Sequence, residues 1–207
     1  MATMDTFKDY YDDLEPDKTA VIAYGRFNPP SIGHALLIDK VDQVTNRTSG
    51  ADGFIVPTHT TGNAKNPLNI DEKIAVLNEM LGDTKRVQTF NGGKHLIATL
   101  QSLEEQGYDN IIHIAGSDRI PEFEKLVGAY NGKPDKKGNI PFTFKNYTME
   151  SAGERDPDSD DVSGMSASKL RAIAIEGDLE AFKAGMAPSV DDNTKEKVFN
   201  IIRERTK

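Results

Sequence analysis

The chain has 207 residues, of which 37% are hydrophobic and 28% are charged, with a formal net charge of −8 and no cysteine. This length and composition fit one globular domain with a buried core, and the lack of cysteine excludes disulfides, thiol catalysis and cysteine-ligated metal sites. No apolar run approaches the roughly 20 residues that cross a bilayer, the acidic N-terminus is unlike a signal peptide, and no cluster of Lys and Arg suits a nucleic acid. We therefore expect a cytoplasmic protein that binds neither membranes nor nucleic acids.

Strands and helices alternate through most of the chain, as the spacing of apolar residues, glycines and prolines indicates. The expected strands are residues 20–24, 53–57, 86–90, 110–115 and 142–147. The expected helices start at Gly33, span 70–81 and 94–106, surround 123–127, and end with 193–205. This alternation predicts an α/β fold with a Rossmann-like parallel sheet of about five strands and helices on both faces. The fourth strand is the most strand-like and is expected to be central.

We expect a single domain over residues 1–207, organised in three parts. Residues 19–150 form the α/β core, 151–165 form an acidic loop, and 166–207 form a phosphate-binding helix followed by C-terminal helices. Ligands of parallel sheets bind at the carboxyl ends of the strands, so the loops after the first and fourth strands are expected to converge on a site. For the acidic loop, a solvated segment is expected rather than a metal site.

The loop after the first strand has the sequence GRFNPPSIGH, residues 25–34, and leads directly into a helix. A strand, a glycine-bearing turn and a helix N-terminus leave unpaired N–H groups and a positive helix end facing the loop. His34 lies in the first helical turn, where its imidazole can donate to a bound phosphate. An isolated histidine at this position is more often a helix cap, but this context predicts a nucleoside triphosphate site.

A second motif, GMSASKLR at residues 164–171, starts the expected helix after the acidic loop. Ser166 or Ser168 can cap this helix, and the guanidinium of Arg171 can reach back to its start. Two hydroxyls, Lys169 and an arginine at a helix N-terminus suit a polyphosphate. Serines that only cap the helix are the simpler alternative.

Two shorter features extend the predicted site. Gly116 and Asp118 follow the fourth strand, and Lys65 lies in the loop after the second strand. The simpler alternatives are an Asp118 that only forms a turn and a Lys65 that is only solvated. The histidines lack metal-ligand spacing, and His113, within the fourth strand, is expected to be a packed side chain. No metal ligand is therefore predicted in the chain.

These motifs carry a family resemblance. GRFNPPSIGH resembles the first signature of the HIGH-type nucleotidyltransferases, G-x-F-x-P-x-H/T-x-G-H, and its GRF start is similar to the nicotinamide-nucleotide adenylyltransferase branch. Ser31 stands where the family has His or Thr, and a serine carries no positive charge. SASKLR resembles the second signature, I-S-S/G-T-x-x-R, and the GSD after the fourth strand is similar to a G-x-D turn whose carboxylate contacts a ribose. The phrases KNPL, GSDR, SAGERDPD and GMSASKLR are similar to those of nucleotidyltransferase-like proteins of large tailed bacteriophages.

The resemblance implies an enzyme that transfers a nucleoside monophosphate, AMP rather than CMP, from a nucleoside triphosphate to a phosphorylated small molecule and releases pyrophosphate. Nicotinamide mononucleotide is one acceptor that fits, and Mg²⁺ is expected on the triphosphate itself. The implied catalytic residues are His34 and Ser31, at the α-phosphate, and Arg171, at the leaving pyrophosphate. The implied nucleotide-binding residues are Gly25, Arg26, Phe27, Asn28, Gly33, Lys65, Gly116, Asp118, Ser166, Ser168 and Lys169.

Two other functions stay open at this point. One is a cytidylyltransferase that acts on a phosphorylated alcohol. The other is a non-catalytic nucleotide-binding or virion-associated protein, which the uncharged Ser31 favours. The expected partners are ATP or CTP and a phosphorylated acceptor, with homo-oligomerisation left open. If the chain is encoded by a phage, the cytoplasm in which it works is that of the host.

Overall fold

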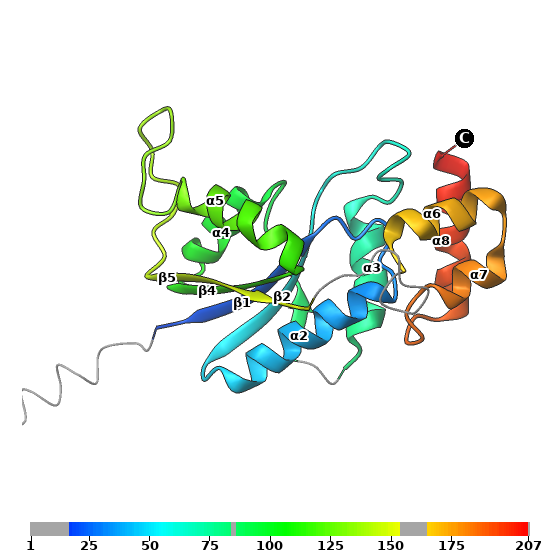
Figure 1. The fold of residues 1–207 in the computed structure, drawn as a ribbon, viewed down its shortest axis with the longest axis horizontal. Coiled ribbons are helices and arrows are strands. Elements are labelled where there is room, and N and C mark those ends of the chain that lie inside the picture. Colours follow the sequence, from blue (N-terminus) through cyan, green and yellow to red (C-terminus); the bar gives the residue numbers. More distant parts are fainter. Residues whose placement is uncertain (1–16, 84–85, 154–164, 207) are drawn as a thin grey trace, which may run out of the picture.

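The computed structural model describes residues 17–83, 86–153 and 165–206, and these form a five-stranded parallel sheet with helices on both faces (Figure 1). The order of the strands is β3-β2-β1-β4-β5, and each neighbouring pair is parallel. The strands are β1 (Thr19–Gly25), β2 (Ala51–Pro57), β3 (Val87–Thr89), β4 (Asn110–Ala115) and β5 (Asn146–Ser151). The predicted Rossmann-like α/β fold is confirmed. The middle strand is β1, and β4 is its interior neighbour.

Two helical layers cover the sheet, and Figure 1 shows α4 and α5 on one side and α2 on the other, with α6, α7 and α8 grouped beside α3. The helices are α2 (Gly33–Arg47), α3 (Ile70–Leu81), α4 (Leu96–Glu105), α5 (Ile120–Gly128), α6 (Ala167–Glu176), α7 (Leu179–Ala184) and α8 (Asp192–Arg205). A short 3₁₀ turn, Ser117–Arg119, lies between β4 and α5. No helix of the described residues combines the length and apolarity needed to cross a membrane.

The central strand contributes to two separate hydrophobic cores. Val21 and Ala23 belong to the core under α2, α3 and α6–α8, whereas Ala20 and Ile22 belong to the core under α4 and α5. Successive residues of a strand point to opposite faces, so a sheet that is covered on both faces needs a continuous apolar run. The run AVIA in β1 meets this requirement, and all four residues are fully buried.

The helix starts follow local capping chemistry. Asn69 caps α3 through a reciprocal pair of bonds with Glu72, and the Ser166 hydroxyl accepts the Lys169 N–H at the start of α6. A side-chain oxygen at this position replaces an intrahelical partner that the first turn lacks. Of the two caps that the sequence offered for α6, Ser166 is the one used. Gly177 ends α6 with a φ of 91°, a left-handed conformation that glycine adopts without strain.

The predicted bounds of the last strand, residues 142–147, are wrong, because the strand spans Asn146–Ser151. Phe142 and Phe144 are buried as expected of a strand, but β5 begins only at Asn146. The Asn131 side chain accepts from the Phe144 N–H at 2.8 Å and donates to the Phe144 carbonyl at 3.3 Å. A side chain rather than a neighbouring strand therefore satisfies these backbone groups of Phe144. Most of the expected acidic loop, residues 154–164, lies outside the described residues.

Candidate active site

The site is organised by the carboxyl ends of β1 and β4, which are neighbours in the sheet. The register pairs Ile22 with His113. Gly25 is the last residue of β1 and Gly116 directly follows β4, so both lie at the carboxyl ends of neighbouring strands, as the sequence predicted. Two adjoining cavities open at this edge. The first, called here the sheet-edge cavity, has a volume of about 550 Å³, and the second, called the helix-start cavity, has about 500 Å³. Both are lined by Arg26, Phe27, His34 and Asp118.

The sheet-edge cavity is mostly apolar along its walls. Its lining includes Tyr24, Leu36, Leu37, Ile114, Phe123 and Gly33, together with Gly25, Gly116 and Arg119. Leu36 is 52% exposed, which is unusual for a large hydrophobic side chain of this protein. A cavity whose lining is more apolar than polar, with polar groups such as Thr58, Asp118 and Arg119 among the apolar ones, suits a small organic molecule that carries charged groups.

The helix-start cavity is polar and carries positive charge. Its further lining residues are Asn28, Lys65, Asn66, Ser166, Ala167, Ser168 and Arg171. It therefore joins the loop after β1, the loop after β2 and the first turn of α6, three segments far apart in the sequence. Lys169, which was also expected to bind nucleotide, lines neither cavity.

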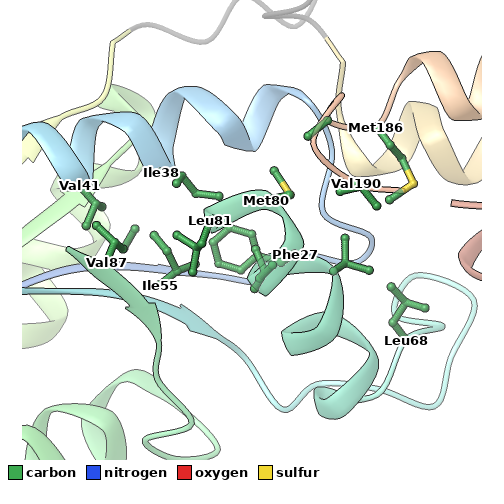
Figure 2. Packing of buried hydrophobic residues seen from close by; sticks show 14 of the residues in the cluster. Phe27, Ile38, Val41, Ile55, Leu68, Met80, Leu81, Val87, Met186 and Val190 are labelled. Atoms are coloured by element: carbon green, nitrogen blue, oxygen red, sulfur yellow. The ribbon is translucent and has the colours of Figure 1, made fainter. Parts of the chain in front are cut away.

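The turn after β1 is held by Phe27, whose φ of 45° is left-handed and rare for a residue other than glycine. Such a conformation costs about 1–3 kcal/mol and persists only where the surroundings compensate for it. The Phe27 ring is fully packed in the core, as Figure 2 shows, and its centroid lies 4.9 Å from that of the His34 ring. A Cβ on Gly25 would come within 3.0 Å of the same ring. The Phe27 ring thus packs closely against Gly25, and a larger residue at position 25 would have to displace the ring.

Asn28 connects the segments around the helix-start cavity. Its amide donates to the Leu68 carbonyl at 3.0 Å and accepts from the Leu68 N–H at 2.9 Å. Its own carbonyl accepts from Arg171 Nη1 at 2.6 Å. The Asn28 side chain is therefore occupied by the protein and holds the loop to Leu68, while its main-chain carbonyl holds the arginine in place.

Ser31 lies behind His34 rather than in a cavity. The Ser31 N–H donates to His34 Nδ1 at 3.0 Å, and the Ser31 hydroxyl lies 2.9 Å from the same nitrogen and 3.0 Å from the Met165 carbonyl. Ser31 is fully buried and lines neither cavity, so this structure does not place it against a phosphate as expected. Because Nδ1 accepts the N–H bond, the neutral ring carries its proton on Nε2.

The start of α6 presents the second predicted group of residues. Arg171 Nη2 donates to the Ser168 hydroxyl at 3.0 Å, and Ser166 is used as the helix cap. Burial, and then the positive charge of Arg26, lower the pKa of Arg171 below its ordinary value. Two guanidinium groups close enough to repel each other form a favourable place for an anion.

Asp118 stands where the two cavities meet, in the 3₁₀ turn after β4. A Cβ on Gly116 would come within 2.7 Å of an Asp118 carboxylate oxygen, so a glycine is needed for the carboxylate to fold back over the turn. The neighbouring Arg119 lines the sheet-edge cavity and lies over the Phe123 ring at 5.4 Å. Sequence reasoning missed Arg119, although it directly follows the GSD motif.

Lys73 was also missed, because its position among Asp71 and Glu72 looked like the polar face of a helix. The side chain is fully buried, and Nζ donates to the carbonyls of Thr58 at 2.7 Å and Thr60 at 2.9 Å. Burial lowers the pKa of Lys73 to about 8. Lys73 therefore holds the start of the loop that carries Lys65.

His113 is a packed histidine, as predicted. Its Nδ1 lies 2.6 Å from the Tyr147 hydroxyl, its ring packs on Phe123, and burial lowers its pKa to about 3. It lines neither cavity. Among the described residues, no group of three or more His, Asp and Glu side chains is arranged to hold a metal ion.

The sequence matches no protein-family model and no curated protein. Its fold is similar to that of the Plasmodium falciparum nicotinic acid mononucleotide adenylyltransferase complexed with NaAD, with a TM-score of 0.56 and 16% identity over 89% of this chain and 98% of that one. The same enzyme complexed with APC gives a TM-score of 0.55 at 15% identity over 89% and 98% of the two chains. A Vibrio parahaemolyticus protein assigned to the nicotinate-nucleotide adenylyltransferases gives 0.53 at 17% identity over 88% and 99%. This chain thus has the fold of the nicotinate-nucleotide adenylyltransferases over nearly its whole length.

Proposed function

We propose that the chain is an adenylyltransferase that transfers AMP from ATP to a phosphorylated small molecule of the nicotinamide or nicotinate mononucleotide class and releases pyrophosphate. One observation carries the proposal: a cationic cavity and a largely apolar cavity adjoin at His34 and Asp118. A triphosphate and an organic acceptor can then meet at a shared border. The fold neighbours complexed with NaAD and with APC support this class of reaction.

In this proposal the triphosphate occupies the helix-start cavity. Arg26, Lys65 and Arg171 supply positive charge there, and the N-terminus of α6 adds the positive end of a helix dipole. A polyphosphate between Arg26 and Arg171 would relieve the repulsion that lowers the Arg171 pKa. Ser168 would add a hydroxyl contact next to Arg171.

The reaction would proceed by in-line attack of an acceptor phosphate oxygen on the α-phosphorus of ATP. The new P–O bond forms as the bond to the bridging oxygen breaks, and the leaving electron pair departs with pyrophosphate. The acceptor phosphate is already ionised near neutral pH, so catalysis would rest on positioning and on charge stabilisation. His34, with its proton on Nε2, would donate to an α-phosphate oxygen, and Arg171 would stabilise the pyrophosphate.

The position of Ser31 changes its proposed role from phosphate contact to support of His34. Its hydroxyl and N–H both lie against Nδ1, so they set the orientation of the ring from behind. Because Ser31 lines neither cavity, an uncharged residue at this position removes no positive charge from either cavity. This removes the sequence feature that favoured a non-catalytic nucleotide-binding protein.

Magnesium would be held by the phosphate oxygens of the nucleotide, where it neutralises charge on the triphosphate. The donor set of the helix-start cavity fits this arrangement, since its charged lining residues are cations apart from Asp118. Asp118 would contact either a ribose or metal-bound water. A cytoplasmic location, in the host if the chain is encoded by a phage, belongs to the same proposal, which leaves homo-oligomerisation open.

The test is pyrophosphate release by the purified chain with MgATP or MgCTP and a panel of acceptors. The panel contains nicotinamide mononucleotide, nicotinate mononucleotide and a phosphorylated alcohol. We expect release with ATP and a pyridine mononucleotide. Tight ATP binding without release for any acceptor would overturn the proposal in favour of a nucleotide-binding protein, and release with CTP alone would overturn the choice of nucleotide.

A further inference from the structure

The segment between β2 and α3, residues 58–69, brings Lys65 and Asn66 to the helix-start cavity. It has little regular structure beyond an isolated bridge between Asn63 and Asn66. Its geometry therefore depends on contacts with other elements. Lys73 holds its first residues, as described above, and its last residues contact the C-terminal helix.

Arg205, in the last turn of α8, makes three hydrogen bonds at the end of this segment. Nη1 donates to the Pro67 carbonyl at 2.8 Å and to Glu72 Oε2 at 2.7 Å, while Nη2 donates to Glu72 Oε1 at 2.9 Å. Glu72 Oε2 also accepts the Asn69 N–H at 2.8 Å. One carboxylate thus joins the start of α3 to the end of α8, and the guanidinium extends the contact to Pro67.

The contact continues into the nucleotide site. Leu68, which follows Pro67, is paired in both directions with Asn28, and the Asn28 carbonyl accepts from Arg171. Arg205 and Arg171 are therefore linked through hydrogen-bonded neighbours, although they belong to different helices.

We propose that Arg205 is a positioning residue of the nucleotide site, which holds the 58–69 segment so that Lys65 faces the triphosphate. The role of Lys65 in this inference rests on the proposed function. The planar fork of an arginine suits two carboxylate oxygens and a carbonyl at once, whereas a lysine supplies one point charge. Partly exposed ion pairs contribute little by themselves, so the expected effect is moderate.

The first test is a double-mutant cycle on ATP affinity, measured by calorimetry with Mg²⁺ present. Arg205→Ala should weaken ATP binding by about 3-fold to 10-fold in the wild-type background and by a smaller factor in a Lys65→Ala background, because the part of its effect that passes through Lys65 is then absent. Arg203→Ala is the matched control, since Arg203 lies in the same helical turn and packs on Phe199 instead. Equal losses in both backgrounds, or no loss in either, would overturn the proposal.

The second test needs no ligand. Amide hydrogen exchange at Gly62, Asn66 and Leu68 should become faster in Arg205→Ala and stay unchanged in Arg203→Ala, because these N–H groups are bonded within the segment or to Asn28. Unchanged exchange in Arg205→Ala overturns the proposal. If Arg205→Ala does not fold, Arg205→Lys takes its place with an intermediate expected effect. If the wild type does not bind ATP, the proposed function fails, and the exchange data still decide whether Arg205 holds the segment.

Discussion

The two cavities share a border but are built in different ways. The sheet-edge cavity is walled by side chains of packed elements, such as Tyr24 in β1 and Phe123 in α5. The helix-start cavity instead depends on hydrogen bonds that join separate segments, as Asn28 does between Leu68 and Arg171. Apolar packing is collective, whereas each hydrogen bond is a single contact. Single polar substitutions should therefore change the helix-start cavity while the sheet-edge cavity keeps its shape.

The largest effect is expected at the border itself. His34→Ala should lower kcat by about 100-fold to 1000-fold, as the loss of a transition-state hydrogen-bond donor does, and should change ATP affinity by less than about 2-fold. The measurements are pyrophosphate release and calorimetry. His95→Ala is the control, because His95 caps α4 away from both cavities. A loss of ATP affinity with kcat unchanged would place His34 in ground-state binding instead.

The next two substitutions, Arg171→Ala and Arg119→Ala, test whether the two cavities bind different substrates. Arg171→Ala should weaken ATP binding by about 10-fold to 150-fold, which corresponds to a charge-assisted contact of about 1.5–3 kcal/mol. Arg119→Ala removes an arginine that lines only the sheet-edge cavity, and it should raise the acceptor KM while ATP affinity stays the same. Calorimetry with ATP and steady-state kinetics with the acceptor measure both. Similar ATP losses in the two variants would contradict the separation.

Ser31→His tests the space behind His34. The nucleotidyltransferase signature that this motif resembles has a histidine or a threonine here, but Ser31 is fully buried and its hydroxyl contacts both His34 and Met165. Overpacking of such a site should lower the free energy of unfolding by about 1–3 kcal/mol and lower turnover as well. Urea denaturation and pyrophosphate release are the measurements, with Ser31→Ala as the smaller control. A rise in turnover would show that the loop can open to accept the ring.

The smallest expected effect concerns His113, which is buried in β4, and it appears only at acidic pH. The pKa of His113 is lowered from 6.5 to about 3 by burial, so below pH 6.5 the unfolded chain binds a proton that the folded chain does not. Stability is therefore lost as the pH falls from 6.5 toward 3, by about 1 to 2 kcal/mol between pH 7 and pH 5. His113→Gln, which keeps an acceptor for Tyr147, should remove this part of the pH dependence in urea denaturation. An unchanged slope in the variant would mean that other groups cause it.

The order of strands and helices could be predicted from the sequence, because apolar periodicity and caps such as Asn69 act within a few residues of the chain. The same is true of the two motifs that start α2 and α6, since a strand, a turn and a helix start are local features. The shifted start of β5 could not be predicted, because it depends on the Asn131 side chain 13 residues earlier.

The roles of individual side chains within the motifs were decided only by the tertiary structure. Ser31 bonds to Met165, 134 positions away, and Arg171 bonds to Asn28, 143 positions away. Whether a polar side chain faces a ligand or the protein depends on which distant groups fold against it, because a buried polar atom needs a partner from whatever surrounds it. The sequence by itself determined the fold, and long-range hydrogen bonding decided which residues of the two motifs line the cavities and which support the others from behind.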